Sequence, residues 1–467
     1  MNILASARAW FGASTNRRIL GATAIVGLLS LVGRVASVAK DLAVAYRFGT
    51  GDDLDAFLIA LVLPTFAINV VASSLNSAFV PIFIEVRERE GAASADRLFR
   101  SVLAMNLVVL SAVSVVLALS FSWALPVLAS NFSPAKLAMT RELFWWLLPI
   151  VALSGMSTVW TGVLNASERF AVGAGAPFAV PAGAAIGVFV GGRALGIDAL
   201  AAGTVAGYVT AAVVTSTAAA RAGWSTLPQW NGLTPDLRRV IGQYAPVVAG
   251  ACLMSSTGLV EQAMASSLPA GSVSALNYGN KLVILLTGLV TMSLGTAMLP
   301  HFSRMVARRE WQAVRHTLRT WTRLIVALTV PLTLVMMAGS TVIVRLAFER
   351  GAFRAHDTEI VAFVQSMYLI QVPFYATGIL FVRMLTSLQR NRTLLVGTAI
   401  SLPLNVLLNY VLMRRLGVAG IALTTSIMYV VSCGYLGLML RRALRTVIGD
   451  AQPAAEGIGA TPALSPR

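Results

Sequence analysis

Long apolar stretches recur along the whole chain, and short polar segments separate them. Each stretch is longer than the roughly 18 residues that an α-helix needs to cross a bilayer. Strands of a membrane barrel are only about ten residues long, so runs of this length exclude a barrel. The pattern predicts an all-α polytopic membrane protein with twelve spans, at about 19–46, 55–84, 97–127, 139–166, 170–192, 197–220, 238–267, 272–302, 320–347, 359–388, 393–413 and 417–440.

The composition excludes a soluble protein. Hydrophobic residues make up 57% of the chain and charged residues only 12%, and the mean hydropathy is +0.76. The net charge of +17 is typical of nucleic-acid-binding proteins at first sight. However, most Lys and Arg residues fall in alternate loops on the side of the N-terminus, which is the positive-inside asymmetry. We therefore expect a multi-pass membrane protein with both termini in the cytoplasm, and no nucleic-acid partner.

The N-terminal segment does not resemble a cleaved signal peptide. Arg8, Arg17 and Arg18 precede the first span, which is too long for a signal-peptide core. Cys252 and Cys433 both fall within predicted spans, and the three histidines show no metal-binding spacing. The sequence therefore predicts neither a disulfide framework nor a metal site.

The two halves of the chain resemble each other at a nearly constant offset. Ser74–Phe83 matches Ser293–Phe302 at an offset of 219, and Leu195–Ala201 matches Leu416–Ala422 at 221. Six spans per half give both halves the same orientation, so we expect a pseudo-two-fold axis along the membrane normal, with substrate bound between two lobes. The predicted organisation is an N-terminal segment 1–18, an N-lobe 19–221, a linker 222–237, a C-lobe 238–443 and a disordered tail 444–467.

Charged residues inside the predicted spans are the candidate functional groups. A charge at the bilayer centre costs roughly 2.5–3.5 kcal/mol on insertion scales, so such residues usually line a cavity or pair with one another. Arg34 and Asp41 are two helical turns apart, which places them on one face about 10 Å apart. Lys281 aligns with Val62 in the repeat, so the scaffold does not require a cation there. The set comprises Arg34, Lys40, Asp41, Asp55, Glu261, Lys281 and Arg383.

These residue types favour an anionic substrate. Arg and Lys in a low-dielectric cavity bind phosphate or pyrophosphate strongly, and we assign this role to Arg34, Lys40, Lys281 and Arg383. The acids Asp41, Asp55 and Glu261 would balance these cations or bind a coupling proton or sodium ion. Structural alternatives remain open: an Arg34–Asp41 ion pair, an N-cap role for Asp55, and interfacial positions for Glu261 and Arg383.

Several motifs together resemble the MurJ/MviN lipid II flippases, a family of the multidrug/oligosaccharidyl-lipid/polysaccharide exporter superfamily. The resemblance covers nearly the whole membrane region. It rests on Gly33-Arg34, Lys40-Asp41, Phe48-Gly49, Asp55-Ala56-Phe57, Leu63-Pro64, Ala78-Phe79-Val80-Pro81, Glu261, Ala265-Ser266, Gly271-Ser272-Val273-Ser274, Tyr278, Lys281-Leu282 and Phe348-Glu349-Arg350-Gly351-Ala352-Phe353.

This resemblance implies two six-helix lobes around a cationic cavity that opens to each side in turn. The family's essential arginines of the first helix map onto Arg34 and Lys40, its second-helix aspartate onto Asp55, and its eighth-helix arginine onto Lys281. The chain departs from the family in having no basic residue in Thr65–Asn69 and in showing twelve rather than fourteen predicted helices.

Two cargoes and two other functions remain open. The flippase would carry lipid II or another polyprenyl-pyrophosphate-linked glycan such as an exopolysaccharide unit. It would work beside cell-envelope synthesis proteins, without a cofactor and without enzymatic activity, driven by sodium, protons or the membrane potential. A multidrug exporter of the same superfamily is the main alternative, although a basic cavity disfavours organic cations. A membrane glycosyltransferase or polymerase is a further alternative, but the chain has no large external loop to hold sugars.

Overall fold

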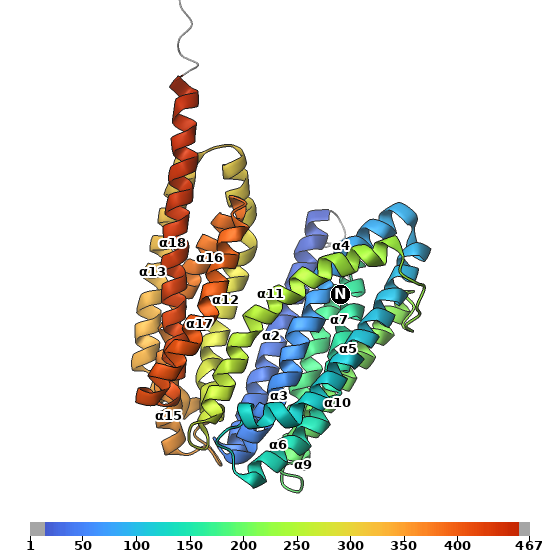
Figure 1. Ribbon diagram of the computed structural model, residues 1–467, viewed down its shortest axis with the longest axis vertical. Coiled ribbons are helices and arrows are strands. Elements are labelled where there is room, and N and C mark those ends of the chain that lie inside the picture. The colour runs from blue at the N-terminus through green and yellow to red at the C-terminus, as the bar shows by residue number, and fades with distance from the viewer. Residues whose placement is uncertain (1–14, 457–467) are drawn as a thin grey trace, which may run out of the picture. The chain divides into compact units, whose positions relative to one another are not determined.

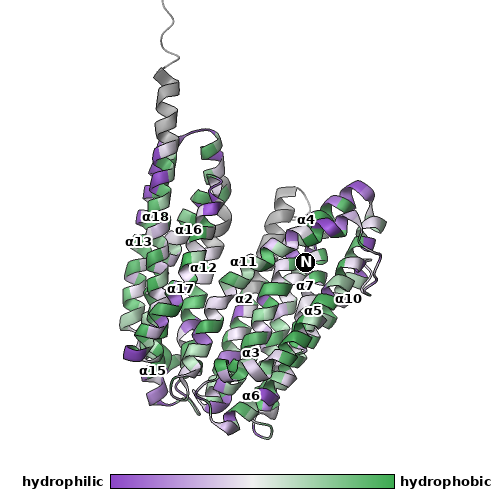
Figure 2. Cartoon of the chain, viewed as in Figure 1, coloured by the Kyte–Doolittle hydropathy of each residue, from purple (hydrophilic) through white to green (hydrophobic). Residues whose placement is uncertain are grey.

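The computed structural model describes residues 15–456, and nearly all of them lie in helices (Figure 1). Eleven helical stretches among these residues are long and apolar enough to cross a membrane. The predicted first span, 19–46, falls in a further helix, α2 (Thr15–Phe48). Apolar residues occupy the middle of most helices, and hydrophilic residues gather toward their ends (Figure 2). The protein is therefore an all-α polytopic membrane protein, as the sequence predicts.

Close contacts divide the chain into two units. The first contains the chain up to Ser274 together with Ala347–Asp357, and the second contains Ala275–Leu346 and the chain from Thr358 on. The helix after the predicted inter-lobe linker, α11 (Pro235–Ser266), thus groups with the first six predicted spans. It does so because Leu237 and Val240 pack into the core of α4 and α5. The lobe boundaries at 221 and 238 stay a prediction.

Several predicted spans of the first unit are divided between two or more helices. Pro149, for example, separates α6 from α7 because proline has no N–H for the helical ladder. After α2 the elements are α3 (Asp52–Ala67), η1 (Ile68–Ala72), α4 (Ser73–Glu90), α5 (Ala92–Leu128), α6 (Pro134–Leu147), α7 (Ile150–Ala166), α8 (Phe170–Gly175), η2 (Ala176–Phe178), α9 (Ala179–Gly191), α10 (Ile197–Arg221) and α11.

The second unit is built from longer helices around its own core. Its helices are α12 (Ser272–Ala307), α13 (Trp311–Ala338), α14 (Ser340–Phe348), α15 (Ala355–Leu369), α16 (Gln371–Ser387), α17 (Asn391–Leu416) and α18 (Val418–Glu456). The first residues of α12 and the last of α14 belong to the first unit. Phe302, Leu380 and Met384 are fully buried in a core formed by α12, α13, α16 and α18.

The C-terminal helix runs beyond the point where the sequence predicts a disordered tail. α18 continues to Glu456, although the tail was expected from residue 444. The helix continues because Leu440 and Leu444 remain buried against the core of the second unit. Residues 457–467 of the predicted tail lie outside the described part of the chain, as do residues 1–14 of the N-terminal segment.

Helices α9 and α10 approach each other through glycines. A Cβ atom on Gly187 would lie 2.3 Å from the Ala199 carbonyl oxygen, and one on Gly203 would lie 2.4 Å from the Gly183 carbonyl oxygen. Small residues four positions apart allow membrane helices to pack backbone against backbone, where lipid supplies no hydrophobic driving force. This contact fixes the ends of α9 and α10 within the first unit.

Candidate functional site

Helix α2 carries the first group of charges. Lys40 Nζ lies 2.8 Å from a carboxylate oxygen of Asp41, and their side chains are 27% and 10% exposed. The sequence placed Asp41 on the face of Arg34 but did not predict this pair, because adjacent helix residues normally point apart. Arg34 is half-buried two turns before Asp41, beside Gly33, whose backbone lies against the Phe178 ring.

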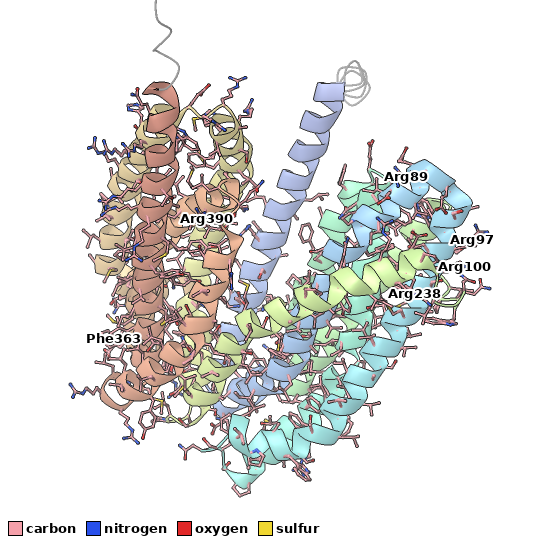
Figure 3. All side chains as sticks on the ribbon, turned by 45° about the horizontal axis from the view of Figure 1, so that its top comes forward. Arg89, Arg97, Arg100, Arg238, Phe363 and Arg390 are labelled. Carbon is pink, nitrogen blue, oxygen red and sulfur yellow. The ribbon has the colours of Figure 1, made fainter. Side chains whose placement is uncertain are left out.

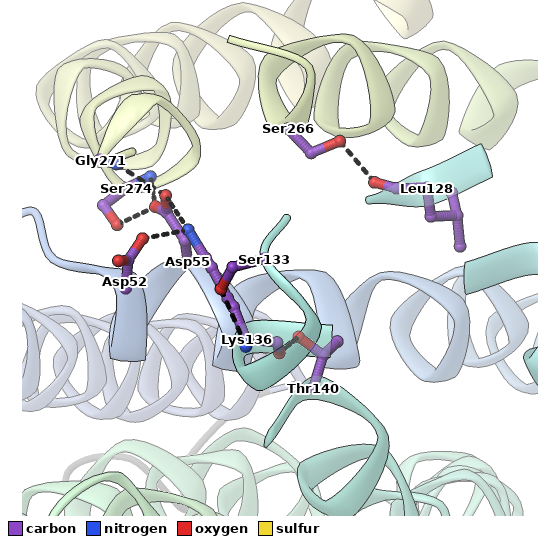
Figure 4. A network of polar contacts seen from close by, with 9 residues as sticks. All are labelled: Asp52, Asp55, Leu128, Ser133, Lys136, Thr140, Ser266, Gly271 and Ser274. Carbon is purple, nitrogen blue, oxygen red and sulfur yellow. Dashed lines mark hydrogen bonds and ion pairs between the residues drawn. The ribbon is translucent and has the colours of Figure 1, made fainter. Parts of the chain in front are cut away.

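Asp55 forms the best-defined polar network of the first unit (Figure 4). It lies in the first turn of α3, and its side chain is 2% exposed. The carboxylate accepts hydrogen bonds from the backbone N–H groups of Gly271 and Ser274, both at 2.8 Å, and from the Ser274 hydroxyl. These two N–H groups belong to the start of α12, whose first turn has donors without helical partners. Asp55 thus caps α12 from another helix.

Lys136 completes the network from α6. Its Nζ lies 3.1 Å from Asp55 and 2.6 Å from Asp52, and only 6% of its side chain is exposed. The ammonium also lies over the Phe132 ring, 3.9 Å from its centroid. A buried carboxylate is tolerated when a cation and hydrogen-bond donors satisfy it, and Asp55 has both. The network ties together the starts of α3, α6 and α12.

The segment from Ala347 to Asp357 docks beside this network in the first unit. The Ala352 N–H donates to the Tyr46 carbonyl oxygen at 2.9 Å, and the Thr50 hydroxyl donates to Asp357. Gly351 has φ +64° and passes so close to Tyr46 that a Cβ would lie 2.2 Å from its carbonyl oxygen. The motif that starts at Phe348 is therefore a docking segment for the α2–α3 connection.

A π-helical turn interrupts the second predicted span. η1 lies one turn after Pro64, which removes a hydrogen bond from the helical ladder. Such turns are rare and often occur at functional positions. The Tyr244 hydroxyl on α11 donates to the Val71 carbonyl oxygen at 2.9 Å, which satisfies an acceptor in the distorted turn. A proline at position 64 permits a kink, but the sequence does not predict this geometry.

The remaining predicted site residues are half-buried. Glu261 lies on α11 in the first unit, whereas Lys281 on α12 and Arg383 on α16 lie in the second. Arg383 Nε is buried and has no hydrogen-bond partner among the residues that the structure describes. Because the cations belong to both units, their common cavity stays a prediction.

The family-specific sequence profile of "Lipid II flippase MurJ" matches residues 44–454. The chain belongs to the MurJ family. Curated relatives are the probable lipid II flippases of Synechocystis, 24% identical over 88% of this chain and 79% of theirs, and of Rhizobium meliloti, 28% identical over 85% and 76%. The lipid II flippase MurJ of Burkholderia cenocepacia is 27% identical over 85% of this chain and 79% of its own.

Solved structures agree with the MurJ assignment at the level of the fold. A lipid II flippase MurJ in an inward closed conformation superposes with a TM-score of 0.77 at 20% identity, covering 90% of this chain and 89% of that one. An inward-facing multidrug transporter of the MATE family gives a TM-score of 0.71 at 13% identity, covering 90% and 99%. The family consists of transporters, so the chain is not an enzyme.

Two polar features of the structure were not identified from the sequence. Lys136 falls between two predicted spans and is not among the candidate charges, although it is one of three lysines in the chain and the other two lie in predicted spans. Its scarcity was the available signal. Asn405 and Asn409 form the second feature, a buried pair on α17 in which the Asn409 amide donates to the Asn405 oxygen at 2.9 Å. Their spacing of one helical turn inside an apolar run could have indicated it.

Proposed function

We propose that this chain is a flippase that carries a polyprenyl-pyrophosphate-linked saccharide across the bacterial cytoplasmic membrane. Lipid II is the first candidate because the chain matches the MurJ family profile over residues 44–454 and its relatives carry that substrate in their names. This match carries the proposal. The uncharged segment Thr65–Asn69 makes another lipid-linked glycan the second candidate cargo.

The proposed headgroup ligands are cations within spanning helices. Arg34 and Lys40 lie on α2 of the first unit, and Lys281 and Arg383 lie on α12 and α16 of the second, so each unit supplies its own cations. An arginine can bind a pyrophosphate in a bidentate manner, and a lysine binds it as a point charge. The Arg383 Nε atom, buried without a hydrogen-bond partner in the described part of the chain, is a donor that such an anion would satisfy.

The acids have separate proposed roles. Asp41 balances Lys40 when no substrate is bound, because their charges lie 2.8 Å apart. Asp55 holds the starts of α3, α6 and α12 together, and opening at this end of the first unit would break its bonds. Glu261 is the proposed site of coupling to sodium or protons, with the membrane potential as the alternative energy source.

The remaining proposals follow from the same function. We place both chain termini in the cytoplasm because the basic loops lie on their side of the predicted topology. The substrate would come from enzymes that build lipid-linked saccharides on the cytoplasmic face, and it would be consumed by polymerising enzymes outside. These synthesis enzymes are the proposed protein partners.

A translocation assay with purified protein tests the function. The full chain is reconstituted into vesicles with fluorescent lipid II, and the label that becomes accessible outside is measured over time. We expect transport by the wild type and a loss of about tenfold or more in Arg34→Gln and Lys281→Gln, because a hydrogen bond to a charged group contributes about 1.5–3 kcal/mol. Arg319→Gln, which changes an exposed arginine on α13, is the matched control. No transport of lipid II, together with transport of a lipid-linked exopolysaccharide unit, would transfer the function to the second cargo.

A further inference from the structure

The segment that joins α10 to α11, residues 222–234, is fastened to the first turns of α5. The Ser225 N–H and hydroxyl both donate to the Asp96 carboxylate, at 2.9 and 2.8 Å. The Gln229 N–H donates to the Arg100 carbonyl oxygen at 3.2 Å, and the Asn231 amide donates to the Ser101 hydroxyl at 3.2 Å. These bonds give the segment, called the linker below, a fixed path.

The linker exposes three large apolar side chains despite this fixed path. Leu227 is 72% exposed, Trp230 is 55% exposed and Leu233 is 53% exposed. Trp224, in contrast, packs edge-on against Phe83, with ring centroids 5.1 Å apart. The linker therefore packs one half-buried aromatic residue against the core of the first unit and leaves a second one exposed.

Basic residues lie beside the linker, which bonds to the carbonyl oxygens of Arg97 and Arg100. Arg97, Arg100 and Arg238 gather at one end of the first unit, together with Arg89 (Figure 3). Two acids at this end already have partners, because Asp96 accepts from Ser225 and Glu85 pairs with Arg89 and Arg239. Within the described ranges, Arg97, Arg100 and Arg238 form no ion pair, and Arg100 Nε is buried with no hydrogen-bond partner. The surface is therefore cationic and can accept anions.

The position of this surface along α5 sets its depth in the bilayer. An exposed apolar face runs down α5 from Val108 through Val116 to Trp123, which is 85% exposed. α5 has no charged residue from Ser101 to Leu128, and at 1.5 Å per residue this stretch rises about 42 Å. The hydrocarbon is about 30 Å thick, so a centred stretch places Arg100 about 6 Å outside it, within the headgroup layer of about 5–8 Å. Tryptophan and arginine are the residues typical of this layer.

We propose that the linker surface binds the anionic headgroups of phospholipids in the surrounding bilayer. Arg97, Arg100 and Arg238 hold the lipid phosphates, while Leu227, Trp230 and Leu233 insert beside the upper acyl carbons. Clustered basic residues near a membrane surface attract acidic lipids, and apolar side chains between them add burial. None of these arginines is among the proposed substrate-binding cations. The surface anchors the start of α11 to the membrane.

The test measures contact between Trp230 and each class of lipid in the full-length protein. The chain is reconstituted into nanodiscs that contain phosphatidylcholine and phosphatidylglycerol. In one sample the phosphatidylglycerol carries bromine on the upper acyl chain, and in the other an equal amount of phosphatidylcholine carries it. The Trp230 signal is obtained by subtracting the fluorescence of Trp230→Phe. We expect brominated phosphatidylglycerol to quench it about twofold or more beyond the level given by brominated phosphatidylcholine.

Two further measurements make the result decisive. The triple variant Arg97→Gln, Arg100→Gln, Arg238→Gln should lose the preference for phosphatidylglycerol but keep quenching by phosphatidylcholine. If this variant does not fold, raising the salt concentration with the wild type should remove the preference instead, because salt screens exposed charges. Trp123, read through Trp123→Phe, is the matched control and should not respond to the triple variant. Equal quenching of Trp230 by both lipids, or none by either, would overturn the proposal.

Discussion

The stretch α3–η1–α4 and the helix α12 occupy equivalent positions in the internal repeat, yet they differ in two ways. Asp55 lies in the first turn of α3, and Ser274, 219 residues later, lies in the first turn of α12. The Ser274 N–H donates a hydrogen bond to the Asp55 carboxylate, so these equivalent residues bind each other. The first contains the π-helical turn after Pro64, whereas α12 has Val283 at the equivalent position and continues as an α-helix. The repeat thus provides a common scaffold, and the substitutions within it carry the polar chemistry.

Backbone geometry elsewhere supports the same repeat within each unit. Gly196 and Gly417 precede α10 and α18 with φ values of +56° and +57°. Glu168 and Gln389, also 221 residues apart, have φ values of +60° and +57° although neither is glycine. Such values are uncommon for residues with a Cβ, so their recurrence at one offset indicates the same local turn. The predicted symmetry axis between the lobes stays a prediction.

Removing Asp55 should have the largest effect on stability. Asp55→Ala leaves Lys136 buried with only Asp52 as a partner, and breaking a buried pair in this way costs about 3–5 kcal/mol. Denaturant unfolding of the purified protein in detergent measures the loss. The double variant Asp55→Ala with Lys136→Met should be more stable than Asp55→Ala alone, because it removes the unpaired charge. A single variant as stable as the wild type would show that the network is not buried.

Replacing Lys281 should reduce transport much more than it reduces the stability of the fold. Lys281→Val introduces the residue type that its repeat equivalent Val62 carries, and we expect lipid II translocation to fall about tenfold or more. The free energy of unfolding should change by less than about 1.5 kcal/mol, since Lys281 is only half-buried.

The reverse exchange, Val62→Lys, is the control for position, because it buries a charge where the side chain is only 8% exposed. It should destabilise the protein by more than Lys281→Val does. Equal transport by Lys281→Val and the wild type would remove Lys281 from the proposed headgroup site.

Loss of the Tyr244 hydroxyl should weaken the π-helical turn that distinguishes α3–η1–α4 from α12. Tyr244→Phe leaves the Val71 carbonyl oxygen without its side-chain donor, which should cost about 1–2 kcal/mol in unfolding free energy. Tyr46→Phe serves as the control because Tyr46 is 59% exposed, and it should be nearly neutral. Equal effects of the two changes would mean that the hydroxyl does not support the turn.

Ser274→Ala should have the smallest effect. The substitution removes one hydroxyl donor to Asp55, but the Ser274 and Gly271 N–H groups and Lys136 remain. We expect a loss of about 1 kcal/mol, measured by the same unfolding experiment. A loss as large as that of Asp55→Ala would mean that the serine hydroxyl, rather than the ion pair, holds the network together.

The sequence predicts the helices well but not the contacts that organise them. Apolar runs located the spans because lipid requires each backbone polar group to be satisfied within its own helix. The Asp55 network could not be predicted in the same way, because Lys136 and Ser274 reach it from helices distant in the chain. The repeat indicated that Asp55 and Ser274 are equivalent, yet equivalence does not predict contact. Local pairs such as Lys40–Asp41 depend on side-chain rotamers that periodicity does not determine.

The proposed function depends on cations within the spanning helices that bind the pyrophosphate of a lipid-linked saccharide. Native mass spectrometry of the purified protein with lipid II compares the wild type with Lys281→Gln and the charge-conserving Lys281→Arg. We expect Lys281→Gln to weaken binding about tenfold or more and Lys281→Arg to retain most of it. Equal affinity of all three proteins for lipid II would show that the charge at Lys281 takes no part in binding.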